Sequence, residues 1–323
     1  MENECKEVRK IMNLPTNSST AKAMSEGMSF KMIYMGMAFE DAIFDAVLRF
    51  KKIQLCGVIL DYSASESEIA AAKSFLAEKN IAEIAFDDIP AVSPDMIFLC
   101  NYNRIIDSNY LDKYLFVNIH AGILPKWRGF NANCWAMLNG ENEIGYTVHR
   151  ARSDFDGGEI YKIISVHLNS MESYSSGRDR IKAILCPQLE QIFLDILNGW
   201  LIPAAQNPEK VVYTCKLRKK DGDIMDWNRP AEYFINLYRV FNGGSGIRMF
   251  IKGSPYQIVD MERVFDIDFA LGIPGGIINI YKDKSIIVKT ADTAVKINLL
   301  CDVGGKTVMP GDLVRIGMRL QKG

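Results

Sequence analysis

Short apolar runs alternate with longer, mixed stretches through the first half of the chain. The runs occupy residues Phe30–Met35, Ile53–Leu60, Ile81–Phe86, Met96–Leu99 and Leu115–Ile119. The stretches Asp41–Phe50 and Glu66–Glu78 lie between them and have the composition of helices. Strands that alternate with helices in this way predict a Rossmann-like α/β domain, with a mostly parallel sheet that carries helices on its faces.

The pattern changes in the second half of the chain. It predicts a strand over Ile160–His167, one long amphipathic helix over Gly177–Asn198, and a proline-containing linker over residues 202–210. After the linker, glycine turns separate short apolar runs at residues 247–251, 257–259, 276–280, 285–290 and 295–299. A single predicted helix, Ala231–Phe241, interrupts this series. We therefore expect a small, β-rich, barrel-like second domain.

These patterns suggest three parts. Residues 1–27 are polar and mixed in charge, so we expect a flexible extension. Residues 28–205 would form the first domain and residues 206–323 the second. The length of 323 residues suits two domains of ordinary size.

Charge and cysteine content narrow the function. The net charge is −1, and proteins that bind nucleic acid through its phosphates usually carry a basic excess, so the charge disfavours a nucleic-acid partner while leaving room for a local basic patch. The seven cysteines are scattered without metal-ligand spacing, which predicts no metal site and suits the reducing cytoplasm. No stretch approaches the ~20 apolar residues of a membrane span.

Candidate chemistry gathers where a predicted strand ends. Asn118 and His120 close the run Leu115–Ile119, and strand alternation places both side chains on one face. Parallel sheets bind ligands beyond the carboxyl ends of their strands. Further along the chain, Asp156 precedes two glycines, which allow a tight turn beside a ligand.

These motifs resemble the 10-formyltetrahydrofolate-dependent formyltransferase family. The chain has Asn-x-His, then a Leu-Pro turn with Arg-Gly, then Gly-x-Thr-x-His, then Asp-x-Gly before a strand. The segment Asp226-Trp227-Asn228 is similar to the entry into the carboxyl-terminal domain of methionyl-tRNA formyltransferases. The resemblance covers roughly residues 30–315 and is greatest to sugar N-formyltransferases. It implies the formyltransferase fold, with 10-formyltetrahydrofolate as co-substrate.

The resemblance also implies catalytic roles. An amine attacks the formyl carbon, and the developing oxyanion needs a hydrogen-bond donor while the amine loses a proton. Asn118 would donate through its amide, His120 would move the proton, and Asp156 would orient the imidazole ring. By the same resemblance, two loops and the turn after His120 would bind the folate, through Tyr102, Asn103, Arg104, Ile123, Leu124, Arg152, Ser153, Asp154 and Phe155.

One segment of the sequence bears on which amine accepts the formyl group. Methionyl-tRNA formyltransferases carry a basic insertion after the second strand, whereas Asp61–Glu68 here is short and acidic. We therefore expect a dTDP- or UDP-linked 4-amino-4-deoxy sugar as acceptor, which implies a role in lipopolysaccharide or glycan biosynthesis. Methionyl-tRNA and a non-catalytic folate-binding relative are the alternatives. The resemblance to sugar N-formyltransferases also implies a homodimer as one possible assembly of this protein.

Several residues have an ordinary structural interpretation beside the functional one. Candidates for acceptor binding are Phe39, Trp127, Phe130, Asn131 and Asn133. In the related enzyme that formylates UDP-4-amino-4-deoxyarabinose, a cofactor-binding arginine stands where this chain has Phe130. Both Phe130 and Trp127 could equally pack the turn. His149 is interpreted as structural, and the basic residues Lys216 to Lys220 as a solvated linker face.

Overall fold

The computed structural model describes residues 29–37, 39, 41–264 and 272–320. The predicted extension, residues 1–27, lies outside the described residues. Contacts divide the chain into two compact units, which are described separately. The first comprises the described parts of Met1–Gly129, Gly145–Ser165 and Arg180–Tyr213, and the second those of Phe130–Ile144, Val166–Asp179 and Thr214–Gly323.

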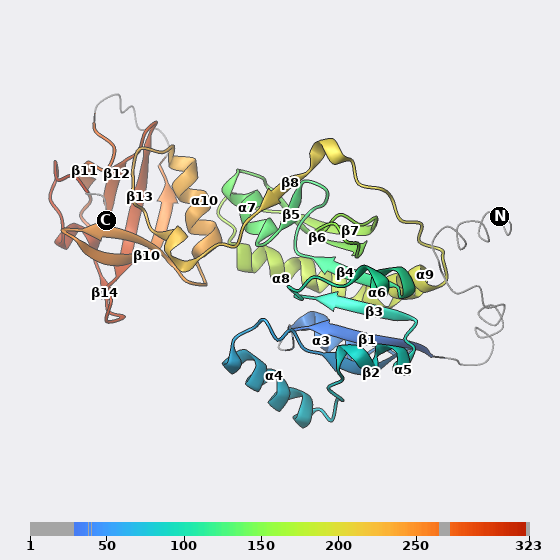
Figure 1. Cartoon of the computed structure of the whole chain (residues 1–323). Helices are drawn as coiled ribbons and strands as arrows, with labels where there is room; N and C mark the ends of the chain where they lie inside the picture. Colours follow the sequence, from blue (N-terminus) through green and yellow to red (C-terminus); the bar gives the residue numbers. More distant parts are fainter. Residues whose placement is uncertain (1–28, 38, 40, 265–271, 321–323) are drawn as a thin grey trace. The chain divides into compact units, whose positions relative to one another are not determined.

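A six-stranded sheet forms the centre of the first unit (Figure 1). Its strands are β1 (Phe30–Gly36), β2 (Ile53–Ile59), β3 (Met96–Cys100), β4 (Phe116–His120), β6 (Glu143–Arg150) and β7 (Ile160–His167), in the order β2-β1-β3-β4-β6-β7. Strands β2, β1, β3 and β4 are parallel, whereas β6 runs antiparallel to β4. The mostly parallel α/β sheet that the sequence predicts is therefore confirmed.

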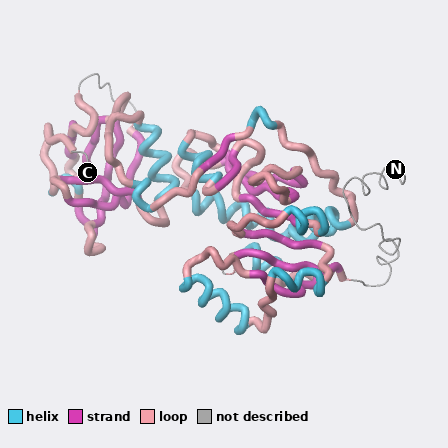
Figure 2. The backbone as a smooth tube through the Cα atoms, in the orientation of Figure 1, coloured by secondary structure: helices cyan, strands magenta, loops and turns pink. Residues whose placement is uncertain are grey.

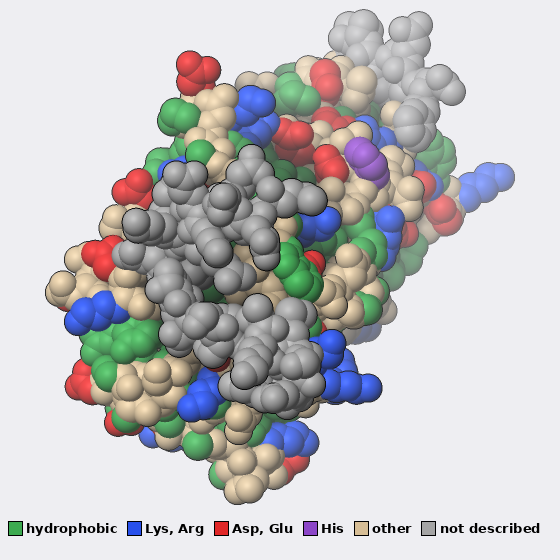
Figure 3. Space-filling model, turned by 90° about the vertical axis from the view of Figure 1, so that its right-hand side faces the viewer, with side chains coloured by type: hydrophobic (Ala, Val, Ile, Leu, Met, Phe, Trp, Pro, Cys, Tyr) green, Lys and Arg blue, Asp and Glu red, His purple; other side chains and the backbone are tan. Residues whose placement is uncertain are grey.

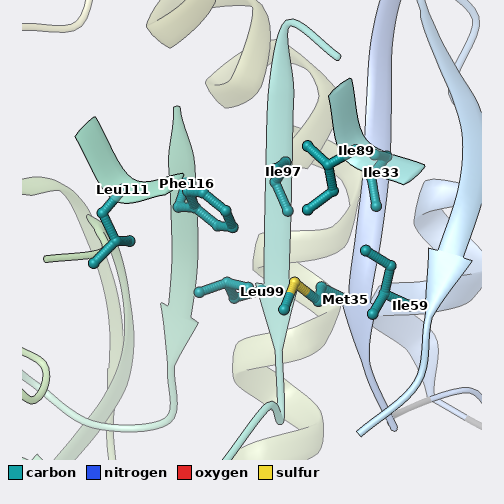
Figure 4. Close-up of a cluster of buried hydrophobic side chains, with 8 residues drawn as sticks. All are labelled: Ile33, Met35, Ile59, Ile89, Ile97, Leu99, Leu111 and Phe116. Atoms are coloured by element: carbon teal, nitrogen blue, oxygen red, sulfur yellow. The ribbon is translucent and has the colours of Figure 1, made fainter. Parts of the chain in front are cut away.

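Strand alternation sends successive side chains to opposite faces of this sheet. On one face, Ile33 and Leu99 pack with residues of the helices α5 (Ile89–Val92) and α6 (Ser108–Lys113) in a buried cluster (Figure 4). On the other face, Tyr34 contacts Phe44 of α3 (Ala42–Val47), and Phe98 contacts Phe193 of α9 (Leu189–Leu197). Both faces of the parallel strands are thus covered, which explains why those strands are mostly apolar.

The helix α4 (Glu66–Glu78) has the bounds that the sequence predicts. Ser65 caps its amino end, because its hydroxyl accepts the Glu68 backbone N–H while the Glu68 carboxylate accepts the Ser65 backbone N–H. This reciprocal capping box satisfies backbone donors that would otherwise lack partners at the start of a helix.

Other predicted elements were wrong in detail. The run Ile81–Phe86 is not a strand and forms only an isolated bridge, through Glu83, to β2. The helix predicted over Asp41–Phe50 ends at Val47. The long helix predicted over Gly177–Asn198 is two helices, α8 (Tyr174–Leu185) and α9, separated by a 3-10 turn that contains Pro187. Proline lacks a backbone N–H and its ring clashes with the preceding turn, so it interrupts the helix.

The second unit is built on an antiparallel sheet (Figure 2). Its strands are β9 (Ile247–Ile251), β10 (Ser254–Arg263), β11 (Ile277–Ile280), β12 (Ile286–Lys289), β13 (Ala294–Cys301) and β14 (Thr307–Val308). The helix α10 (Ala231–Phe241) has the predicted bounds and packs against β10 and α7 (Ala132–Leu138). This is the β-rich carboxyl-terminal unit that the sequence predicts. Within the described residues, no helix is long and apolar enough to cross a membrane.

Candidate active site

Asn118 and His120 lie at the carboxyl end of β4, as predicted. Strand β6 runs beside them in antiparallel register, which pairs Asn118 with His149 and His120 with Thr147. Thr147 is fully buried and fixes the turn that follows His120, because its hydroxyl donates to the Gly122 carbonyl and accepts the Leu124 N–H. The strand end and its turn are therefore held together by side-chain hydrogen bonds.

Asp156 brings a carboxylate to this strand end from the loop between β6 and β7. Its Oδ2 lies 3.4 Å from Nδ1 of His120, and its Oδ1 lies 3.7 Å from Nε2 of His149. Oδ2 also accepts the Gly129 backbone N–H at 2.9 Å. The structure thus places Asn118, His120 and Asp156 together, with their side chains largely buried.

The backbone at Asp156 adopts a left-handed conformation, with φ at 51°. Such a conformation is uncommon outside glycine, although aspartate tolerates it better than most residues. The glycine two residues later is needed for a different reason. A Cβ on Gly158 would lie 1.8 Å from the Arg150 carbonyl oxygen, so only glycine permits this close approach.

His149 is a member of the site that the sequence interpretation left as structural. Its Nδ1 lies 2.9 Å from the Arg150 carbonyl oxygen, which can only accept, so Nδ1 carries the hydrogen. Nε2 is consequently an acceptor and receives the Asn118 amide at 2.9 Å. Burial lowers the pKa of His149 to about 4, against the opposing charge of Asp156. His149 is therefore neutral near pH 7 and orients the Asn118 amide.

This pKa gives the first prediction. His149 has a pKa of about 4 in the folded chain and about 6.5 when unfolded, so the unfolded chain binds more protons between these values. The stabilisation from keeping His149 neutral is complete above pH 6.5 and is lost as the pH falls towards 4, up to about 3 kcal/mol in total. We expect His149→Gln, which keeps an acceptor towards Asn118, to show a shallower loss of unfolding free energy over this range.

Urea unfolding of both proteins at several pH values between 4 and 7 measures the difference. His167→Gln is the matched control, because this substitution also removes one imidazole but does so at an exposed position. Equal slopes in wild type and His149→Gln would contradict the prediction.

The tautomer of His120 follows from similar reasoning. Its Nε2 lies 2.6 Å from the Trp127 carbonyl oxygen, so Nε2 donates and is turned into the protein. Nδ1 is the ring nitrogen that faces Asp156. In the arrangement described here, proton exchange with a substrate therefore falls to Nδ1.

The two hydrogens of the Asn118 amide differ in their hydrogen bonds: one makes a short bond and the other a long one. The first is donated to His149 at 2.9 Å, whereas the second has only a 3.4 Å contact with Oδ1 of Asp156. A long hydrogen bond is weak and readily exchanged for a shorter one. This second N–H is the donor that can turn to a developing negative oxygen.

Gln206, from the predicted linker, contacts the loop that carries Asp156. Its amide nitrogen donates to the carbonyl oxygens of Asp156 and Gly158, both at 2.7 Å. Its amide oxygen accepts Nε and Nη2 of Arg128, at 3.1 and 2.9 Å. Arg128 also donates to the Tyr213 hydroxyl. Composition suggested only a linker here, because no motif reveals that Gln206 returns to the loop.

The residues expected to bind folate occupy two loops and a turn of the first unit, after β3, β6 and β4 respectively. Tyr102 is half-buried, while Asn103 and Arg104 are exposed. The Asn103 backbone N–H donates to the buried Asp61 carboxylate at 2.7 Å, which ties this loop to the end of β2. Ile123 is half-buried and Leu124 is buried in the turn after His120.

The second loop carries Arg152, Ser153, Asp154 and Phe155, all of them exposed. Phe155 presents an aromatic ring that is 50% exposed, whereas Arg152 is held by Glu159 through two hydrogen bonds. The exposed ring suits a flat heterocycle, as does half-buried Tyr102. The second loop also carries Asp156, whose carboxylate lies beside Asn118. These residues fit a folate, with Arg152 the least available because of its ion pair.

The residues expected to bind the acceptor differ widely in how exposed they are to solvent. Phe39 is only 4% exposed and packs in an aromatic cluster with Tyr34 and Phe44, so it has little surface to offer a ligand. Trp127 is also buried, at 7% exposed, and Asn133 is buried in α7. Phe130 is 36% exposed, and Asn131 is exposed and accepts the Leu217 N–H. Burial makes packing the better account of Phe39, Trp127 and Asn133.

Comparison with known families agrees with this geometry. Residues 54–184 match the family model for the formyl transferase domain, and residues 216–316 match that for the formyl transferase carboxyl-terminal domain. The chain therefore belongs to the formyl transferase family. It is therefore an enzyme.

Individual relatives cover both units. The chain is 26% identical to the methionyl-tRNA formyltransferase of Bacillus licheniformis, over 76% of this chain and 77% of that protein. Among solved structures, an N-formyltransferase of Helicobacter canadensis, in complex with folinic acid and dTDP-3-aminofucose, matches with a TM-score of 0.60 and 14% identity, over 84% of this chain and 99% of that one. HypX of Aquifex aeolicus with tetrahydrofolic acid matches with a TM-score of 0.57 and 17% identity, over 88% of this chain and 46% of that one.

These relatives correct the expected acceptor. The sugar nucleotide was the wrong choice, because the curated relatives, at 23–28% identity over about three quarters of the chain, are methionyl-tRNA formyltransferases. The sugar enzymes resemble the chain only in fold. The inferred role in glycan biosynthesis is withdrawn with the sugar acceptor, and the non-catalytic alternative is wrong as well. The homodimer stays a prediction.

Proposed function

We propose that this enzyme transfers the formyl group of 10-formyltetrahydrofolate to the amino group of methionyl-tRNA. The observation that carries the proposal is the similarity to methionyl-tRNA formyltransferases, which extends through both units of the chain. The site supports the reaction type, since it combines an amide donor, an imidazole and a carboxylate at one strand end. The six described cysteines are free, which suits our further proposal of a cytoplasmic enzyme.

The charge argument against RNA fails for a physical reason. A net charge of −1 sums the whole chain, whereas phosphate contacts depend on local cationic side chains. On the face drawn in Figure 3, basic and acidic side chains are interspersed. Lys216, Arg218, Lys219 and Lys220 are exposed in the second unit and are available for phosphate contacts. The short acidic segment after β2 removes one possible contact surface and leaves these side chains in place.

In this proposal, each residue of the site has one task. The loosely held Asn118 N–H donates to the oxygen of the formyl group as negative charge develops there. His120 receives the proton of the attacking amine at Nδ1, and Asp156 stabilises the resulting imidazolium. His149 is neutral and holds the Asn118 amide in place, so it exchanges no proton near pH 7. The bond between the formyl carbon and the donor nitrogen then breaks, His120 gives its proton to that nitrogen, and tetrahydrofolate leaves.

The proposal predicts that purified protein formylates methionyl-tRNA. With formyl-labelled 10-formyltetrahydrofolate, we expect label in acid-precipitable aminoacyl-tRNA, released by mild base as formylmethionine. Uncharged tRNA is the control, because it has the same phosphates and lacks the amine. Label transfer to an amino-sugar nucleotide, with none to methionyl-tRNA, would overturn the proposal.

A further inference from the structure

The hydrogen bonds of Gln206 are saturated and chemically specific. Its amide nitrogen has two hydrogens, and the carbonyls of Asp156 and Gly158 take one each. Its amide oxygen accepts two donors of the Arg128 guanidinium. Carbonyls only accept and guanidinium only donates, so the side chain at this position must donate on one side and accept on the other. Of the natural side chains of this length and shape, only glutamine does both.

The two carbonyls that Gln206 binds lie on either side of Gly157, in the loop that carries Asp156. The left-handed backbone of Asp156 is intrinsically unfavourable, so surrounding contacts must maintain it. Its carboxylate has contacts of 3.4 Å with His120 and 3.4 Å with Asn118, which are too long to hold it tightly. The short hydrogen bonds that tie Asp156 to groups outside this loop come from the Gly129 N–H to its carboxylate and from Gln206 to its backbone carbonyl. Within the loop, the Gly157 N–H donates to the Asp154 carbonyl at 3.0 Å.

We propose that Gln206 is a positioning residue for formyl transfer, which sets the carboxylate of Asp156 against His120 and Asn118 by holding the backbone of its loop. The other half of its amide is anchored by Arg128, which is 8% exposed and also donates to the Tyr213 hydroxyl. The segment that follows α9 within the first unit thereby contributes to the site. The inference rests on the role proposed for Asp156, and it does not depend on which amine is the acceptor.

Two substitutions separate positioning from stability. Gln206→Glu keeps an acceptor for Arg128 and adds an ion pair, but its carboxylate cannot donate to the two carbonyls. Gln206→Met keeps the length of the side chain and removes both functions. The matched control is Gln188→Glu, because exposed Gln188 also donates to a backbone carbonyl, that of Ile184.

Steady-state formyl transfer provides the first readout. We expect both Gln206 variants to lower kcat by about 10- to 100-fold, because a displacement of about 1 Å in a reacting group can cost 10²-fold. The KM for 10-formyltetrahydrofolate should remain near its wild-type value, since the loss is confined to the transition state. The control should match wild type. A wild-type kcat in both Gln206 variants, or a loss no larger than the fraction of unfolded protein, would overturn the inference.

Histidine NMR provides a second readout that needs no acceptor. The chain has three histidines, so the ring signals of His120, His149 and His167 can be assigned by substitution. We expect the Gln206 variants to shift the His120 and His149 signals and to leave exposed His167 unchanged. Unchanged site signals would contradict the positioning role. Failure of the wild type to formylate methionyl-tRNA would contradict only the proposed acceptor, because the NMR measurement would still test the role of Gln206.

Discussion

Replacing Asp156 with asparagine is expected to lower kcat by about 10²–10⁴-fold, because the substitution removes the negative charge that faces Nδ1 of His120. The amide oxygen of asparagine can still accept the Gly129 N–H, so the loop should keep its place. Its amide nitrogen would then take the place of Oδ1, beside Nε2 of His149 and the Asn118 amide, and offer donors where a carboxylate now accepts. The imidazolium of His120 would lose its counter-charge during proton transfer.

Single-turnover transfer with saturating 10-formyltetrahydrofolate measures this loss directly, since product release does not enter. Asp87→Asn is the matched control, because Asp87 is exposed and lies in a 3-10 turn of the first unit. A wild-type rate in Asp156→Asn would show that the carboxylate does not take part in the reaction.

Replacing Asn118 with alanine is expected to lower kcat by about 10²–10³-fold, the usual loss on removing one oxyanion donor. The substitution should also lower stability, because Asn118 donates to the buried Nε2 of His149. Alanine leaves this acceptor without its donor, which should cost about 1–3 kcal/mol of unfolding free energy.

Two measurements on Asn118→Ala therefore have separate expected outcomes: a large fall in kcat and a modest fall in the urea midpoint. Asn109→Ala, at an exposed position on α6, controls for the loss of an amide. If kcat fell only as far as the folded fraction, Asn118 would have a structural role and the proposed donor would have to lie elsewhere. If stability were unaffected, its hydrogen bond to His149 would be energetically unimportant.

The catalytic strand end was readable from the sequence because its determinants are local. Alternation alone puts Asn118 and His120 on one face, and the apolar run before them marks a buried strand. The acceptor was misjudged on the same local basis, from total charge and one missing insertion. Neither quantity records which side chains gather on a surface, so the comparison with relatives was needed to correct it.

The sequence by itself determined the α/β class of the first unit, the β-rich character of the second, the reaction type, and the three residues that the structure places together. Periodicity and motif spacing are properties of neighbouring residues, so they need no tertiary contact. Only the tertiary structure decided the protonation and tautomers of the histidines in the site and the hydrogen bonds that hold its residues in place. Burial makes His149 a neutral acceptor, and the Trp127 carbonyl selects the tautomer of His120. Gln206, which lies 50 residues after Asp156 in the sequence, binds the backbone of the Asp156 loop. These depend on which groups meet in space and on how far water is excluded, and no spacing in the sequence encodes either.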